Sequence, residues 1–359
     1  MTTASIPGLN NGPIEDIAST SEVSGIELMS FSCEPYMVPA SHGFGKCRLI
    51  TEFEKIAFIG EGAYGSVYKV RDKKNDKIVA LKKLKIAKNE KSFPMNFTRE
   101  VNILKRLYHD NIANLLGVVV GRVFESTYLL LEYCPYELSK IVDDEVAKTK
   151  IDQTHIKCIM HQLFTGLCYL HENFVLHRDL TVTNILFTEI GVLKITDFSN
   201  CRMATEEKMT PNVVSRWYRA PELLFGATNY ASAIDIWSAG CIFAELLLKR
   251  PLFKTDSDNN MISMLVDLLG TPTETNWPGF SDLPLMKDYE LRDQPHNKLT
   301  LKFAEQPTTC IALLHKVFVY NPSKRITAEK CLIHSYFTDK PTACDLDTLV
   351  VLLKKVDEI

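Results

Sequence analysis

Three polar side chains in the middle of the chain have the types and the spacing that phosphoryl transfer requires. Asp179 and Asn184 lie in the loop 177–184, and Asp197 ends the strand-like run 192–196 that follows. Apolar segments flank the loop on both sides, so rigid neighbours can fix its polar side chains. One carboxylate to hold a hydroxyl, with a carboxylate and an amide to hold metal ions, is the minimum equipment for moving a phosphoryl group.

The bulk composition argues against several other classes of protein. The 359 residues are 46% hydrophobic, enough for a large core in about two lobes. A net charge of -3 gives no electrostatic case for a nucleic acid or an acidic membrane as partner. The cysteines form no CxxC pair, so we expect free thiols rather than disulfides or a zinc site. No apolar run approaches the roughly 20 residues that span a bilayer, and the N-terminus lacks the pattern of a signal peptide.

The two ends of the chain differ from its middle in composition and in the pattern of apolar residues. Residues 1–46 are rich in Ser, Thr, Gly, Pro and Asn without a sustained period, and we predict a mostly disordered N-terminal extension there. Patterned sequence runs from residue 53 to about residue 337. In the C-terminal tail 338–359, residues 345–356 have the spacing of an amphipathic helix. That helix either docks on the domain or stays apart from it.

A glycine-rich stretch follows the first strand-like run. Gly60, Gly62 and Gly65 have the GxGxxG spacing, which occurs in plain tight hairpins, in dinucleotide-binding turns and in loops that close over phosphates. A dinucleotide-binding turn requires a helix directly after the glycines. Here β-branched and aromatic residues follow, and they favour a strand. We therefore predict a hairpin that closes over phosphates, with Val67 packed on a flat ring.

A lysine and a glutamate downstream of the hairpin form a candidate ion pair. Lys82 lies on a predicted strand at 78–84, and Glu100 lies early in a predicted helix at 98–109. A lone strand lysine is usually an ordinary exposed side chain, and a glutamate early in a helix usually serves the helix dipole. The hairpin changes both interpretations, because a lysine that contacts phosphates needs a carboxylate to position it. We therefore predict that Glu100 pairs with Lys82.

The remaining apolar segments outline a buried scaffold. Residues 114–120 and 128–134 are typical of two buried strands, and the segment around Pro135 is a candidate hinge whose backbone could grip a flat purine. A plain core strand and turn is the alternative. The longer segments predicted to follow are helices at 156–173 and 235–246 and a loop-rich stretch at 272–297.

The order of these motifs resembles the catalytic domain of a eukaryotic protein kinase across residues 53–337. A glycine-rich hairpin, a strand lysine, a helix glutamate, an HRD loop with its asparagine, a DF dipeptide and an APE tripeptide follow one another along the chain. The resemblance implies an α+β, bilobal protein kinase fold. Its small, β-rich N-lobe would span about 53–134, and its larger, mainly helical C-lobe about 135–337.

Within that family, three stretches are similar to those of the cyclin-dependent kinases: 94–100, 217–224 and 270–272. This likeness implies a cyclin as partner, with an M-type cyclin as the candidate, and protein substrates modified on Ser or Thr before Pro. It also implies a role in cell-cycle or transcription control, and residence in the nucleus, the cytoplasm or both. Neither a nucleic acid nor a membrane is expected as a partner.

The resemblance implies a role for each matched residue. Asp179 would orient the substrate hydroxyl and accept its proton, while Asn184 and Asp197 would hold Mg²⁺ against the phosphates of ATP. Lys82, positioned by Glu100, would hold the α- and β-phosphates. The residues implied to surround the nucleotide are Ile59, Gly60, Glu61, Gly62, Ala63, Tyr64, Gly65, Val67, Ala80, Lys82, Leu131, Glu132, Cys134 and Leu186.

The resemblance also implies control by phosphorylation. Thr210 sits where the family carries its activating phosphothreonine, and Tyr64 matches an inhibitory site in the glycine-rich loop. Guanidinium groups around a phosphate can order a loop through charge-assisted hydrogen bonds. The arginines that match such a cluster are Arg99, Arg178 and Arg202. Glu222 and Arg325 would form a structural ion pair in the larger lobe.

Two departures from the family pattern bear on activity. Thr181 stands where the family has a lysine that contacts the γ-phosphate, which removes a positive charge from the transition state. Ser199 replaces the glycine of the DFG motif, where serine restricts the backbone and adds a hydroxyl. We expect an active but slower or more tightly gated enzyme. The alternative is a pseudokinase that binds a cyclin or a scaffold without catalysis.

Overall fold

The fold is known from a computed structural model that describes residues 25–29, 35–39, 47–62, 65–86, 93–123, 125–204, 208–211 and 213–357. The chain divides into two compact units, Met1–Cys47 and Arg48–Ile359. In the first unit, strands β1 (Gly25–Met29) and β2 (Pro35–Pro39) pair in antiparallel fashion. The predicted disordered extension lies mostly outside the described residues. The sequence analysis did not foresee the two paired strands, because runs of this length are too short for a periodicity to be recognised.

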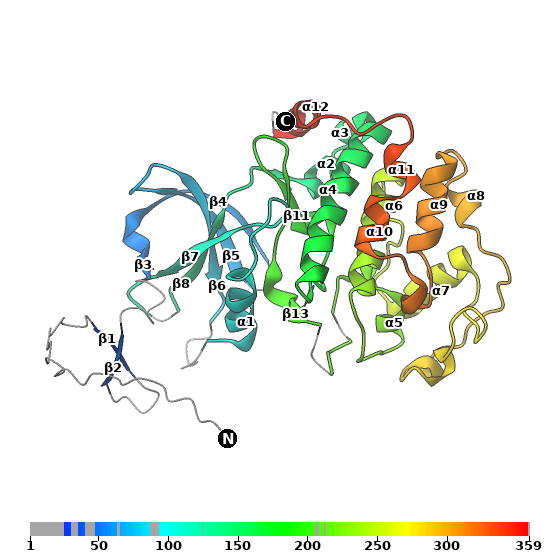
Figure 1. Cartoon of the computed structure of the whole chain (residues 1–359), viewed down its shortest axis with the longest axis horizontal. Helices are drawn as coiled ribbons and strands as arrows, with labels where there is room; N and C mark the ends of the chain where they lie inside the picture. The colour runs from blue at the N-terminus through cyan, green and yellow to red at the C-terminus, as the bar shows by residue number, and fades with distance from the viewer. Residues whose placement is uncertain are drawn as a thin grey trace, which may run out of the picture. The chain divides into compact units, whose positions relative to one another are not determined.

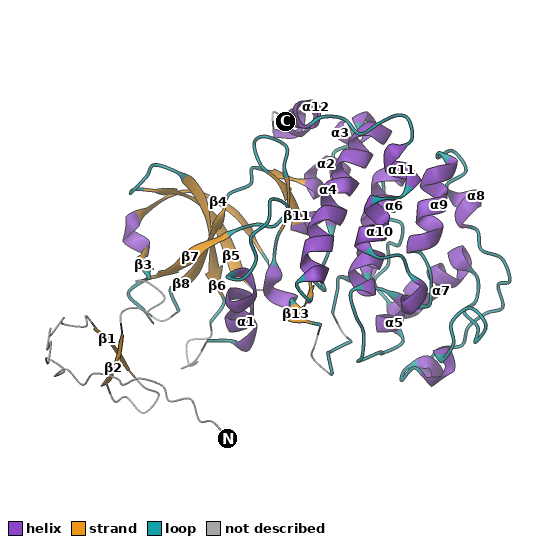
Figure 2. Cartoon of the chain, viewed as in Figure 1, coloured by secondary structure: helices purple, strands orange, loops and turns teal. Residues whose placement is uncertain are grey.

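A six-stranded sheet begins the second unit (Figures 1 and 2). Its order is β3-β7-β8-β6-β5-β4, and every pair is antiparallel except β3 with β7. The strands are β3 (Arg48–Leu49), β4 (Phe53–Glu61), β5 (Gly65–Asp72), β6 (Ile78–Leu84), β7 (Leu115–Val120) and β8 (Thr127–Glu132). The predicted strands at 53–59, 78–84, 114–120 and 128–134 are thereby confirmed, with bounds shifted by one or two residues.

One helix, α1 (Met95–Leu104), packs against this sheet. Phe97 and Val101 on its inner face join Leu84 and Leu129 in a buried cluster, which fixes the helix beside β6 and β8. The helix was predicted at 98–109. The helix begins earlier than predicted because Pro94, whose ring fixes φ, stands at its N-cap. It also ends earlier, at Leu104.

The rest of the second unit is mainly helical (Figure 2). Its helices are α2 (Leu138–Asp143), α3 (Ala147–Lys150), α4 (Gln153–Glu172), α5 (Pro221–Leu224), α6 (Ala233–Leu248), α7 (Asp258–Leu269), α8 (Leu299–Lys302), α9 (Thr308–Val317), α10 (Ala328–Leu332), α11 (Ser335–Thr338) and α12 (Leu346–Asp357). Short strands are β9 (Tyr136–Glu137), β10 (Val175–Leu176), β11 (Ile185–Phe187), β12 (Leu193–Ile195) and β13 (Arg202–Met203). Single 3₁₀ turns lie at Ile50–Glu52, Val182–Asn184, Phe198–Asn200, Arg216–Tyr218, Phe280–Asp282, Met286–Asp288 and Pro322–Lys324.

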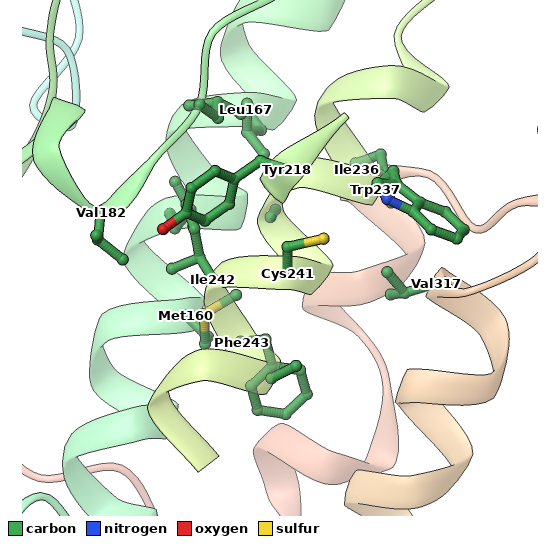
Figure 3. Packing of buried hydrophobic residues seen from close by; sticks show 14 of the residues in the cluster. Met160, Leu167, Val182, Tyr218, Ile236, Trp237, Cys241, Ile242, Phe243 and Val317 are labelled. Carbon is green, nitrogen blue, oxygen red and sulfur yellow. The ribbon is translucent and has the colours of Figure 1, made fainter. Parts of the chain in front are cut away.

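The core of the helical lobe is built around α4 and α6 (Figure 3). Helix α6 is apolar on every side, as expected of a helix surrounded by protein. Trp237 and Phe243 on α6 are fully buried. The ring of Tyr218 lies between α6 and Val182 of the loop 177–184. Arg325 donates to both carboxylate oxygens of Glu222, at 2.7 and 2.9 Å, so the ion pair implied by the resemblance is confirmed.

Two further features concern the C-terminus and membranes. The predicted helix at 345–356 is present as α12 and packs against α2, α3 and α4, so it docks on the domain. Its apolar residues Leu349, Leu352 and Leu353 are buried. In the described part of the chain, no helix combines the length and the apolar character needed to cross a membrane.

Candidate active site

A buried carboxylate at the N-terminal end of α6 anchors the catalytic loop 177–184. Asp235 accepts hydrogen bonds from the backbone amides of His177 and Arg178, both at 2.9 Å, and contacts the ring of His171 at 3.1 Å. Burial alone would raise the pKa of Asp235, but these partners outweigh it and lower that pKa. Arg178 has φ +65°, a region that side chains other than glycine rarely occupy. The bonds to Asp235 therefore hold the loop in a strained conformation.

The three side chains that first suggested phosphoryl transfer come together around this loop. Asn184 donates from Nδ2 to the backbone oxygen of Asp179 at 2.7 Å. The backbone carbonyl of Asn184 accepts the amide of Thr196 at 3.0 Å, which places Asn184 beside the strand end that carries Asp197. Asp197 has φ +60°, so the chain turns sharply at this residue. Sequence spacing and fold thus agree on one site.

A buried ion cluster joins the two lobes at this site. Lys82 Nζ on β6 lies 2.8 Å from Glu100 Oε1 on α1 and 2.7 Å from Asp197 Oδ1. The predicted pair of Lys82 with Glu100 is confirmed. Burial alone would lower the pKa of Lys82, but the two carboxylates outweigh it and raise that pKa. Burial would also raise the pKa of Asp197, yet Lys82 keeps it below its ordinary value. Burial raises the pKa of Glu100 against the attraction of Lys82, so the shifts favour the charged forms of Lys82 and Asp197 only.

The donor set beside this cluster suits a hard divalent cation. Because the nitrogen of the Asn184 amide is bound to Asp179, the amide oxygen is left as the outward acceptor. Asp197 uses Oδ1 for Lys82 and Ser199, and its Oδ2 has no hydrogen bond within the described residues. The described part contains no cluster of three or more His, Cys, Asp or Glu side chains that could enclose a metal. A site with two protein oxygens is the kind that Mg²⁺ shares with phosphates.

The glycine-rich hairpin between β4 and β5 is formed as predicted. Gly62 donates its amide to the carbonyl of Gly65 at 2.8 Å. At Gly65 an added Cβ would lie 1.9 Å from the carbonyl oxygen of Lys83, so only glycine fits there. Ala63 and Tyr64 lie outside the described residues.

The remaining residues predicted for the nucleotide lie on the six-stranded sheet, except Leu186 on the separate sheet β12-β11-β9. They are Ile59, Gly60 and Glu61 on β4, Val67 on β5, Ala80 on β6, Leu131 and Glu132 on β8, and Leu186 on β11. The amide of Glu132 donates to the backbone carbonyl of Asn114 at 3.1 Å. Burial raises the pKa of the Cys134 thiol to about 12, so that side chain stays neutral next to the hinge. Their roles toward the nucleotide stay predictions.

The predicted phosphate-binding arginines are placed only in part around Thr210. Arg178 donates to the hydroxyl of Tyr230 at 2.8 Å, and that hydroxyl donates to the carbonyl of Thr210 at 2.7 Å. Arg178 therefore reaches, through Tyr230, the activation segment, which runs from the DF dipeptide at 197–198 to the APE tripeptide at 220–222. The sequence analysis missed this link. Arg202 lies on β13 opposite Leu176, and Arg99 lies on α1. Tyr64 lies outside the described residues.

The sequence analysis also missed the partners of the catalytic carboxylate. Asn200 Nδ2 lies 3.1 Å from Asp179 Oδ2, and the amide and hydroxyl of Ser215 lie 3.1 and 3.3 Å from Asp179 Oδ1. The hydroxyl of Thr181 is 2.6 Å from that of Thr183. No sequence spacing could have indicated these contacts, because the activation segment brings Ser215 back from far along the chain.

This fold and this assembly of charged groups define a protein kinase, and the chain belongs to that family. The family model for the protein kinase domain matches residues 53–337. The match agrees with the geometry, in which a strand lysine, a helix glutamate and the catalytic loop meet at one site. A protein kinase binds ATP, and the position of the nucleotide beside Lys82 stays a prediction.

Relatives identify the branch of the family. Cyclin-dependent kinase 10 from Homo sapiens is 46% identical over 312 residues, which cover 86% of each chain. Cyclin-dependent kinase 11A from Homo sapiens is 40% identical over 314 residues, 87% of this chain and 40% of that one. A chain of the CAK complex from Chaetomium thermophilum bound to ATP-gamma-S matches with TM-score 0.75 and 33% identity, covering 83% of this chain and 94% of that chain. The chain is thus a serine/threonine protein kinase of the cyclin-dependent type.

Proposed function

We propose that this kinase, bound to a cyclin and to Mg²⁺, transfers the γ-phosphate of ATP to a Ser or Thr that precedes Pro. The assembled cluster of Lys82, Glu100 and Asp197 carries the proposal. A lysine held by a helix glutamate is the arrangement that must be in place for phosphoryl transfer. The relatives and the assembled cluster give no support to a pseudokinase.

The chain's own residues divide the work of the transfer. Lys82 would hold the α- and β-phosphates, and Asp179 would receive the hydrogen bond and then the proton of the substrate hydroxyl. Asn184 and Asp197 would hold Mg²⁺, which when bound neutralises charge on the phosphates. The Asp235 anchor keeps Asp179 in place, so that the reacting oxygen meets a fixed carboxylate.

Proline specificity is supported by the backbone near the end of the activation segment. Val214 has φ +67°, and its carbonyl accepts Arg219 Nη2 at 3.0 Å and Nε at 3.3 Å. The carbonyl of Val213 also accepts Arg219 Nε, at 3.0 Å. A substrate amide buried next to these occupied carbonyls would lack a partner, at a cost of about 1–3 kcal/mol. Proline has no N–H, so it avoids this cost.

A cyclin as partner is supported by an exposed face of α1. A groove of about 240 Å³ runs along this helix and reaches Met203 of the activation segment. Met95 on its border is 74% exposed, which is unusual for so apolar a side chain. A partner seated there would press on the helix that carries Glu100. By likeness to the cyclin-dependent kinases we propose an M-type cyclin, a role in cell-cycle or transcription control, and residence in the nucleus, the cytoplasm or both.

The test is a transfer assay with the purified complex. The kinase with an M-type cyclin and Mg-ATP should phosphorylate a Ser-Pro peptide and much less a matched Ser-Ala peptide. Asp179→Asn should lower kcat by about 10²-fold or more, because it removes the proton acceptor. Asp293→Asn, at an exposed loop position, is the control. Equal turnover by Asp179→Asn would refute the assigned mechanism, and equal use of both peptides would refute the proline preference.

A further inference from the structure

The catalytic carboxylate has a hydrogen-bond donor that neither the family motifs nor the transfer mechanism above assigns. Asn200 Nδ2 lies 3.1 Å from Asp179 Oδ2. An ionised carboxylate only accepts hydrogen bonds, so the nitrogen of the Asn200 amide must be the atom that faces it. The contact joins the residue directly after Ser199 to the residue that would receive the substrate proton.

The backbone around Asn200 fixes this contact. The carbonyl of Asn200 accepts Arg178 Nε at 2.9 Å. The thiol of Cys201 donates to the carbonyl of His177 at 3.4 Å, and the next residue, Arg202, pairs with Leu176 in the β10–β13 ladder. The segment 200–202 therefore runs antiparallel to the segment 176–178. Asn200 meets the catalytic loop twice, through its carbonyl and through its amide, so its side chain is directed by the fold.

The other contacts of Asp179 leave it little freedom. Ser215 contacts Oδ1 through its amide at 3.1 Å and its hydroxyl at 3.3 Å. A carboxylate has about four acceptor positions, and these donors with Asn200 occupy three of them. One position remains for the substrate hydroxyl. Within the described residues, no Lys or Arg forms an ion pair with Asp179, and Thr181 brings no charge.

We propose that Asn200 is a positioning residue for phosphoryl transfer. It holds Asp179 so that the remaining acceptor position faces the substrate hydroxyl. Without it the carboxylate can rotate about its side-chain bonds, and the productive orientation is populated less. The role rests on the proposed phosphotransfer function and adds a residue to it.

The test compares two replacements of nearly equal size in the full chain with its cyclin. Asn200→Leu removes the donor, and Asn200→Asp replaces it with a like charge. Loss of a hydrogen bond to a charged group should lower kcat about tenfold or more in Asn200→Leu, and further in Asn200→Asp. The KM for ATP should stay near wild type, because Lys82 and the hairpin hold the nucleotide. The KM for a Ser-Pro peptide and Tm should also stay near wild type. Asn260→Leu and Asn260→Asp, at an exposed position of α7, are the matched controls.

The outcomes separate this role from the function on which it rests. An active wild type with unchanged kcat in both Asn200 variants overturns the positioning role alone. A raised KM with unchanged kcat also overturns it, because Asn200 would then serve substrate binding. Should Asn200→Leu and Asn200→Asp both melt early, Asn200→Ser, too short to reach Asp179, must still show the selective loss of kcat. A wild-type complex without turnover removes the proposed function and this role together.

Discussion

Ser199 shows how a residue that departs from its family motif can fit the same backbone. It lies in the 3₁₀ turn Phe198–Asn200 and does not have a positive φ, so the freedom of glycine is not required in this conformation. Its hydroxyl donates to Asp197 Oδ1 at 2.7 Å, on the same oxygen that Lys82 contacts. The restriction expected from sequence therefore brings no strain here. Instead the serine adds a bond that holds Asp197 in the arrangement required for transfer.

Thr181 is the departure that should limit the rate, and restoring the charge tests this. Thr181→Lys should raise kcat by about tenfold or more, since a fixed positive group near the transferred phosphoryl stabilises the transition state. The side chain is buried, and among the described residues its one hydrogen bond is to the hydroxyl of Thr183, so its replacement breaks no ion pair there. Thr300→Lys, which adds the same charge at an exposed position of α8, is the control. An unchanged kcat in steady-state assays would show that the loop already compensates.

At the residue scale, motif spacing predicted the groups that carry charge and missed those that position them. Lys82, Glu100 and Asp197 are recognisable because each follows a distinctive local pattern. Asn200 and Ser215 are ordinary polar residues without a motif of their own. They meet Asp179 only because the activation segment folds back onto the catalytic loop, and no local pattern encodes that return.

At the element scale, α6 links the core of the helical lobe to catalysis. The apolar run predicted at 235–246 extends in the structure from Ala233 to Leu248, and its outer turns are buried as well. Asp235 at its first turn holds the catalytic loop, and Glu245 near its end accepts the hydroxyl of Tyr218 at 2.7 Å. The sequence predicted this helix, since a long apolar pattern is reliable. The contacts of Asp235 and Glu245 could not be predicted from the sequence, because they depend on the fold.

Helix α12 tests how much a terminal element contributes to the domain. Leu349 and Leu353 are completely buried against the helical lobe. Leu353→Ala should lower the free energy of unfolding by about 2–5 kcal/mol through lost contacts and the cavity that remains. Val351→Ala, at a position 54% exposed, should cost less than about 0.5 kcal/mol. Urea unfolding curves give both values, and equal costs would mean that α12 does not dock in solution.

At the scale of the whole molecule, the bilobal plan could be predicted because its elements alternate clearly along the chain. The β-rich part precedes the helical part, and the β-rich part has two buried clusters of its own. The pairing of β1 with β2 and the docking of α12 could not be predicted. Both depend on which other segment packs there, and a short apolar pattern does not specify that segment. The lobes meet through the ion pair of Lys82 with Asp197 and through a shared apolar cluster that includes Ile103 and Ile112.

The stability of the whole molecule should carry a pH dependence from one buried acid. Burial raises the pKa of Glu245 from 4.5 to about 7, against the effect of the Tyr218 hydroxyl. In the folded chain this carboxyl therefore keeps its proton more tightly than in the unfolded chain. Its contribution to stability is complete below about pH 4.5 and is lost as the pH rises through about 7.

Replacing Glu245 with a side chain that cannot ionise isolates this dependence. Between pH 5 and pH 8 the free energy of unfolding of Glu245→Gln should rise relative to wild type by on the order of 2–3 kcal/mol, because the cost of charging a buried acid is absent. The other titrating groups are shared and cancel in the difference. Urea unfolding at each pH measures it, with Glu305→Gln as an exposed control that should give a flat difference. A flat difference for Glu245→Gln would place its titration outside this range and remove Glu245 as the source of the dependence.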